Sequence, residues 1–148
     1  MIQIIIRNKL GKKLDLLESK KAIFNQAIHE AGFMVEDAVA ADIQAYPSVD
    51  TGVFAASVST DTSVPYQTRV FTDVPYAKFL EYGTSPHFVK PRVKEALRWK
   101  GADGWFFSKG HMVGGIKPRR HFARTAMAMK DKVVEFIRQK MATPKGAE

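Results

Sequence analysis

The four histidines are the side chains of this chain best suited to hold a metal ion or to exchange protons near neutral pH. They stand at His29, His87, His111 and His121. The last three lie in the second half of the chain, in or next to expected loops, so they could converge. None of them forms the helical i, i+4 pair of a zinc motif, and the chain has no cysteine. We therefore expect surface or hydrogen-bonding histidines, with no metal and no cofactor.

A serine hydrolase would need a nucleophile, a base and an acid that meet in space. Ser108, His111 and Asp103 supply the residue types, but any chain of this length offers such a combination. No Gly-x-Ser-x-Gly nucleophile elbow is present. The glycine-rich loop 110–115 lacks the Gly-Lys-Ser/Thr ending of a phosphate loop. The sequence thus predicts no enzyme, and a small hydrolase built on a histidine of the second half stays as a third hypothesis.

Positive charge is concentrated in the second half of the chain. Residues 1–85 carry 8 Lys/Arg and 10 Asp/Glu, a net −2, whereas residues 86–148 carry 15 and 5, a net +10. Large aromatic side chains are interleaved with the basic ones: Trp99, Trp105, Phe106, Phe107 and Phe122. Single-stranded nucleic acid is bound by such a mixture. We expect instead that the aromatic side chains alternate into a core, while the basic face meets nucleic acid, an acidic protein or only water.

Two helical stripes frame the chain. Apolar residues recur every three or four positions from Lys12 to Ala45, where Tyr46-Pro47 ends the pattern, and again from His121 to Met141. Gly32 interrupts the first stripe and indicates a bend or a close packing contact. Ile2–Ile6 reads as a strand, followed by a turn at Asn8–Gly11.

Short alternating segments between the stripes predict strands at 57–62, 66–72, 96–99 and 105–108, with an extended stretch at 87–90. A short helix is expected at Pro75–Tyr82, ended by Gly83. The order predicts an α+β fold, in which an antiparallel sheet of about four strands packs against both long helices. We expect one domain over residues 1–141 and a flexible tail at 142–148.

The opening apolar run, Ile2 to Ile6, is too short for a signal segment and far too short to cross a bilayer. With no cysteine, nothing points to an oxidising compartment. We expect a protein that is made in a cytoplasm and does not contact a membrane.

Three motifs stand out between the two helical stripes. The first is Val49–Val58, where Asp50 or Thr51 can cap a turn and Gly52 can let the chain reverse. The second is Val74–Thr84. The third is looser and runs from Val89-Lys90-Pro91-Arg92 to Lys117-Pro118-Arg119-Arg120-His121-Phe122.

Over about residues 46–130 these motifs resemble those of phage neck and tail-completion proteins. The first is similar to that family's Asp-Thr-Gly-x-Leu-x-x-Ser-Ile signature, and the second to its Tyr-Ala-x-x-x-Glu-x-Gly-Thr motif. The positions of this chain that match them are Asp50, Thr51, Gly52, Ser57, Tyr76, Ala77, Glu81, Gly83 and Thr84.

The resemblance implies a structural virion protein of a tailed phage, acting in head–tail joining or tail completion. Copies would form a ring, six-fold in the family, at the head–tail junction or the upper tail, after assembly in the host cytoplasm. Expected neighbours are head-completion, tail-terminator or tail-tube proteins, with non-specific DNA contact as a further possibility. The expected interface comprises the loops 83–90 and 110–120, with Pro86, His87, Lys90, Lys117, Arg119 and Arg120. The alternative is a small basic nucleic-acid-binding module.

Overall fold

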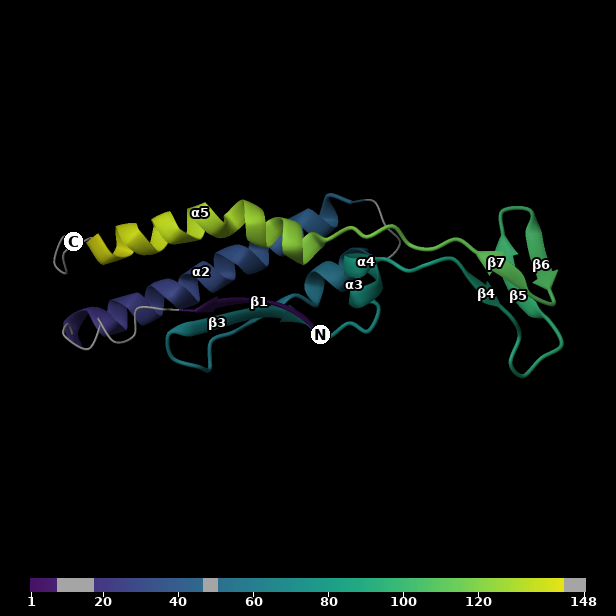
Figure 1. The fold of residues 1–148 in the computed structure, drawn as a ribbon, viewed down its shortest axis with the longest axis horizontal. Helices are drawn as coiled ribbons and strands as arrows, with labels where there is room; N and C mark the ends of the chain where they lie inside the picture. Colours follow the sequence, from purple (N-terminus) through teal and green to yellow (C-terminus); the bar gives the residue numbers. More distant parts are fainter. Residues whose placement is uncertain (8–17, 47–50, 143–148) are drawn as a thin grey trace.

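The computed structural model describes residues 1–7, 18–46 and 51–142 of the chain. It has the predicted α+β fold (Figure 1). Its elements are β1 (Ile2–Arg7), α2 (Glu18–Gln44), α3 (Thr51–Ala56), β2 (Ser59–Asp61), β3 (Gln67–Thr72), α4 (Ala77–Tyr82), β4 (His87–Val89), β5 (Leu97–Gly101), β6 (Gly104–Ser108), β7 (His111–Val113) and α5 (His121–Ala142).

The larger part of the chain, which we call the body, comprises the elements from β1 to α4 together with α5. It is built on a three-stranded antiparallel sheet of order β1-β3-β2. The central strand alternates, so that Thr68, Val70 and Thr72 are buried while the residues between them are partly exposed. Helix α2 packs on this strand, and α5 runs along α2 (Figure 1) and also contacts β1.

The apolar stripes predicted for the two long helices meet inside the body. One cluster contains Val35, Val39 and Ile43 from α2 and Phe122 and Val133 from α5. Each fully buried side chain of this size contributes roughly 1.5–3 kcal/mol to folding. The pairing of α2 with α5 therefore supplies much of the stability of the body.

Gly32 marks a close contact between α2 and the sheet. Of the two predictions for this position, a bend or a close packing contact, the second is confirmed. A Cβ atom at this position would collide with Cγ2 of Thr68 and lie 3.1 Å from Cγ2 of Thr60. The missing side chain lets the helix approach β3 closely enough to exclude any larger residue.

A second part of the chain projects beyond α3 and α4 (Figure 1). We call residues 84–118 the arm. It consists of two antiparallel ribbons, β4 with β7 and β5 with β6. No arm residue belongs to the apolar cluster of the body, so the arm packs mainly on itself.

The expected sheet of about four strands is divided into one three-stranded sheet and these two ribbons. The prediction that the loop 110–115 is irregular is wrong in part, because residues 111–113 pair with β4 as β7. The predicted turn at 8–11, the start of the first helix at 12–17 and the tail at 143–148 lie outside the described residues. The single-domain assignment stays a prediction.

The predicted burial of the arm aromatics is also wrong. Trp99, Trp105, Phe106 and Phe107 are all exposed, and only Phe122 on α5 is buried. A two-stranded ribbon has two faces, and neither the outer face of β5–β6 nor that of β4–β7 has a helix across it. Alternation along each strand thus sorts the side chains between two surfaces that both meet solvent.

None of the helices within the described ranges is long and apolar enough to span a bilayer.

Candidate functional site

The arm is joined to the body at a root where two segments of backbone run together. The Thr84 N–H donates to the Ile116 carbonyl at 2.9 Å, and the Ile116 N–H donates to Thr84 Oγ1 at 3.0 Å. Closer to α5, the Arg119 N–H donates to the Leu80 carbonyl at 2.7 Å. These bonds hold the outgoing and returning segments in one register, so the arm leaves the body in a defined direction.

Gly83 is required at the root for two reasons. Its φ of 76° lies in the left-handed region, and its N–H closes α4 by donating to the Phe79 carbonyl at 2.9 Å. A Cβ atom there would lie 2.5 Å from the Ile116 carbonyl oxygen and 2.9 Å from the Pro118 ring. Gly83 therefore ends α4, as predicted, and also makes room for the returning segment.

Glu81 connects the same helix to α5. Its carboxylate is 3% exposed and accepts the N–H of Phe122 at 3.1 Å and that of Ala123 at 2.9 Å. These are backbone donors at the start of α5 that have no partner within the helix. A carboxylate also interacts favourably with the positive end of the helix dipole. Glu81 is thus an N-terminal cap supplied from a distant part of the sequence.

The first motif lies at α3 and the turn that follows it. The Ser57 hydroxyl donates to the Phe54 carbonyl at 2.7 Å and shares a 2.7 Å hydrogen bond with Thr72 Oγ1, which ties α3 to β3. Gly52 lies within α3 and has no positive φ, so the predicted reversal there is wrong. Thr51 begins α3, whereas Asp50 lies outside the described residues.

Tyr76 and Ala77 place α4 on the body. Ala77 is buried at the start of the helix, and its N–H donates to the Val74 carbonyl at 3.0 Å. The Tyr76 ring meets the ring of Phe54 edge-on, with centroids 6.0 Å apart. These motif residues dock a short helix and carry no reactive group into a cavity.

A charged cluster joins the end of α2 to the start of α5. Asp42 Oδ2 lies 2.8 Å from Nδ1 of His121, and Arg124 binds both Asp42 oxygens through Nη2, at 2.7 and 2.6 Å. Arg124 Nη1 donates to the Tyr46 hydroxyl at 2.8 Å. His121 is 1% exposed, and its pairing with Asp42 holds the two helices together.

Electrostatics in this cluster favour the ionised carboxylate. Partial burial raises the pKa of Asp42, but hydrogen bonds from Arg124 and His121 outweigh that effect and leave the pKa below its ordinary value. The hydrogen bond to Asp42 correspondingly raises the pKa of Arg124. Both partners are therefore charged at neutral pH, and the cluster contributes to the stability of the body.

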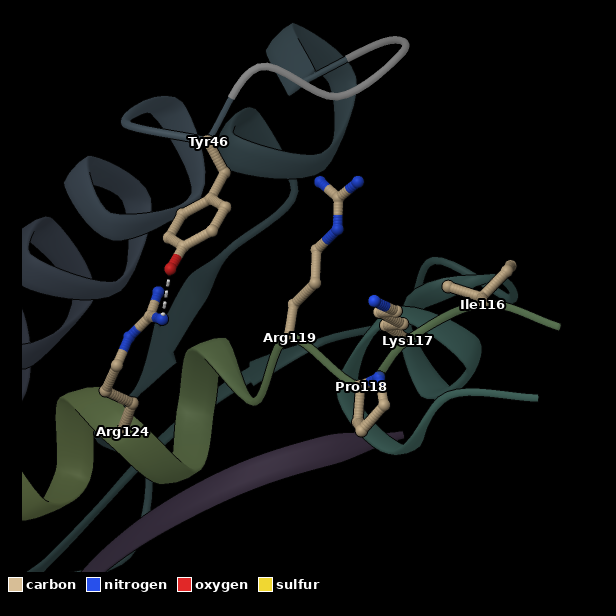
Figure 2. Close-up of a pocket in the computed structure, with 6 residues that line it drawn as sticks. All are labelled: Tyr46, Ile116, Lys117, Pro118, Arg119 and Arg124. Atoms are coloured by element: carbon tan, nitrogen blue, oxygen red, sulfur yellow. Dashed lines mark hydrogen bonds between the residues drawn. The ribbon is translucent and has the colours of Figure 1, made fainter. Parts of the chain in front are cut away.

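A basic pocket of about 680 Å³ opens beside the cluster at the root of the arm (Figure 2). It is lined by Tyr46, Ile116, Lys117, Pro118, Arg119 and Arg124. One nitrogen of Arg119, Nη1, is buried and has no hydrogen-bond partner among the described residues. Asp42 is already engaged by His121 and Arg124, so the pocket offers excess positive charge that suits a carboxylate or a phosphate.

The predicted interface residues lie in three places. Pro86, His87 and Lys90 are exposed on the arm, where the His87 Nδ1 lies 3.2 Å from the Ser85 carbonyl. Lys117 and Arg119 line the pocket. Arg120 is exposed just before α5, with a φ of 54° that is unusual for a side chain of its size. The hydrogen bonds between Thr84 and Ile116 keep the segments 83–90 and 110–120 close together at the root.

Sequence reasoning missed one face of the arm. In the β5–β6 ribbon, Arg98 lies opposite Phe107 and Lys100 lies opposite Trp105. All four side chains are exposed and lie on the same face, where the Arg98 guanidinium sits 4.3 Å from the centroid of the Trp105 indole ring. Part of the signal was present, because alternation along the predicted strand 105–108 puts Trp105 and Phe107 on one side. The predicted strands did not include Lys100, and the pairing of these residues with Arg98 and Lys100 follows from the observed register.

The other face of that ribbon is turned toward β7. Trp99 stacks on Phe106 with centroids 5.8 Å apart and lies 5.1 Å from the ring of His111. Within the described residues no hydrogen bond joins Ser108, His111 and Asp103, the residue types that a serine hydrolase would need. Within the same residues no group of three His, Asp or Glu side chains could hold a metal ion.

Comparison with known proteins identifies one family. Residues 6–83 match the family model described as "Bacteriophage HK97-gp10, putative tail-component". No curated protein and no solved structure matches the chain. The matched residues comprise most of the body up to Gly83, whereas the arm and α5 follow the matched part.

Proposed function

We propose that this chain, which belongs to the HK97-gp10-like family of bacteriophage tail components, is a ring-forming subunit that acts in head–tail joining or tail completion. Family membership makes it a structural component of a phage tail. The position at the head–tail junction or upper tail, the six-fold ring and the lack of catalysis are parts of the proposal. So are its neighbours, which would be head-completion, tail-terminator or tail-tube proteins.

The observation that carries the proposal is the arm. It is held rigidly at its root and carries exposed Phe88, Trp105, Phe107 and Met112. Trp105 and Phe107 lie on the outer face of β5–β6, whereas Phe88 and Met112 pair on β4–β7. Large apolar side chains exposed on a projecting element are typical of a protein–protein interface, since leaving them in water is costly. A ring requires that each copy presents one surface to the next, and a projecting arm provides such a surface.

The first test is electron microscopy of induced lysates in which the gene is deleted. Filled heads and separate tails, without joined particles, are expected for a joining role. Tails of abnormal length would indicate that the protein acts at the end of the tail. Normal, infectious particles would contradict the proposal. Complementation with a variant that carries both Trp105→Ser and Phe107→Ser tests whether the arm is needed. The matched control is Val134→Ser, at an exposed position of α5.

A nucleic-acid-binding module is the second candidate, favoured by the charge of the arm. Seven Lys or Arg stand against two Asp or Glu over residues 84–118, a net +5. This candidate predicts DNA binding whose log affinity falls steeply with log salt concentration. Binding that vanishes at physiological salt would count against it.

A further inference from the structure

We infer that the exposed face of the β5–β6 ribbon docks on the exposed acidic face of α2 in a neighbouring copy of the same chain. This inference rests on the proposed function, since it names the surfaces through which ring subunits would meet. It goes beyond that function by committing to a partner and to the residues on both sides.

The arm contributes a surface that alternates positive and aromatic side chains. Arg98 and Lys100 lie on β5, opposite Phe107 and Trp105 on β6. Phe107 is 67% exposed and Trp105 is 55% exposed. Neither basic residue has an ion-pair partner among the described residues. This face, which we call the arm face, therefore needs a partner that offers both acid and apolar contact.

The body contributes a surface of the opposite kind on α2. Phe33 is 51% exposed in the middle of the helix. Asp37, one turn later on the same side, is exposed, and Glu36 is partly exposed. In the described part of the chain neither acid forms an ion pair. Glu30, three residues before Phe33, is already paired with Lys140 of α5 at 2.8 Å, and the neighbours Ala22, Gln26 and Gln44 carry no charge. We call this surface the α2 face.

The two faces are complementary in charge and in polarity. The arm has a net charge of +5 over residues 84–118, whereas α2 carries five Asp or Glu against two Lys over residues 18–44, a net −3. Phe33 can contact the aromatic rings while Glu36 and Asp37 meet Arg98 and Lys100. Such pairing sets both the register and the choice of partner.

The contact must join different copies. The arm projects past α3 and α4, away from the middle of α2 in its own chain (Figure 1). An arm face on one copy and an α2 face on the next make a head-to-tail interface, which repeats until it closes into a ring. DNA is a weaker match for the arm face than α2, because Phe33 offers an apolar counterpart to the large aromatic side chains of the arm face.

The absence of cysteine from the chain allows a direct proximity test. Phe33→Cys and Phe107→Cys variants of the full-length protein are mixed and treated with a short bifunctional maleimide. We expect crosslinked dimers in the mixture at a yield about tenfold above either variant alone. A chain with both cysteines should give a ladder of covalent multimers. Val134→Cys on α5 replaces Phe33→Cys as the control, and Asp37→Cys is a second variant on the α2 face.

Charge exchange tests the specificity of the contact. Glu36→Lys with Asp37→Lys reverses the α2 face, and Arg98→Glu with Lys100→Glu reverses the arm face. Each reversal alone should lower the crosslinking of the single-cysteine pairs about tenfold. Mixing the two reversed proteins, or combining all four changes in one chain, should restore it. The matched control is Lys132→Glu, at an exposed position of α5, which should leave the crosslinking yield unchanged.

The outcomes separate this inference from the proposed function. Both tests are repeated in assembled particles that carry the cysteine variants. If gene deletion blocks head–tail joining but particles show no crosslink between positions 33 and 107, the role stands and this interface is wrong. If arm reversal weakens DNA binding and leaves crosslinking unchanged, the arm binds DNA and the inference is overturned. Failure of the mixed reversed proteins to crosslink overturns it as well.

Discussion

Replacing Glu81 by Gln tests the junction from which the arm emerges. The substitution keeps the shape of the side chain but removes its charge and one of its two acceptor oxygens. The amide NH₂ group would then face one of the two backbone donors, Phe122 N–H or Ala123 N–H, that the carboxylate now binds. One donor would lose its partner in a site where water has little access, since Glu81 is almost fully buried.

The magnitude follows from these contacts. A hydrogen bond to a charged group contributes about 1.5–3 kcal/mol, and a charge at a partly buried helix end contributes up to about 2 kcal/mol. Releasing the buried carboxylate from its desolvation offsets part of both. We expect Glu81→Gln to lower the free energy of unfolding by about 2–3 kcal/mol, measured by urea titration with far-UV circular dichroism. The midpoint of thermal unfolding should fall by about 5–10 °C.

The control is Glu135→Gln on α5, the helix that Glu81 caps. Glu135 is exposed and pairs with Arg138 at 2.8 Å on the surface of α5, so its loss should change stability by less than about 0.5 kcal/mol. If Glu81→Gln is as stable as the wild type, the carboxylate does not hold α4 to α5. The backbone hydrogen bonds of Thr84, Ile116 and Arg119 would then have to fix the root without it.

Three further substitutions test contacts of the body. Asp42→Asn should remove an acid-dependent part of the stability: the folded pKa of Asp42 lies below its ordinary 3.8, so its contribution is complete above that value and is lost as the pH falls through the folded pKa. Urea midpoints from about pH 6 down to about pH 2 should therefore converge for wild type and variant, and a constant difference would contradict this. Gly32→Ala should destabilise by about 1–3 kcal/mol through its collision with Thr68 Cγ2, although alanine favours a helix by about 1 kcal/mol; calorimetry should show partial recovery with Thr68→Ser, and a stabilised single variant would refute the close contact. Arg120→Gly should stabilise the fold by about 0.5–1 kcal/mol, because Arg120 has a φ of 54°; a lower urea midpoint would show that its side chain contributes more than the backbone strain costs.

Local patterns predicted most of the secondary structure. The end of the first helical stripe, the second stripe, the strands β5 and β6 and the end of α4 at Gly83 all lie within a residue or a few of their predicted places. These features depend on neighbours in the sequence, namely helical periodicity, strand alternation and the freedom of glycine at positive φ. The first two motifs, Val49–Val58 and Val74–Thr84, likewise resembled those of phage tail proteins, and the chain belongs to a family of phage tail components.

The roles of the motif residues could not be predicted in the same way. Glu81 caps a helix that begins forty residues later, and Asp42 binds side chains about eighty residues away. No local pattern specifies which distant donor a carboxylate will meet. The same holds for Gly83, whose need for space arises from Ile116 and Pro118.

The sequence by itself determined which side chains share a face, because that follows from the period of each helix and strand. Alternation along the predicted strand 105–108 puts Trp105 and Phe107 on one side, and helical periodicity puts Phe33 and Asp37, four residues apart, on one side of α2. Only the tertiary structure decided which of those faces are covered, since burial depends on what packs across a face. In the body α2 and α5 cover each other's apolar stripes, whereas nothing in the described part of the chain covers the arm face, and its aromatic side chains remain exposed.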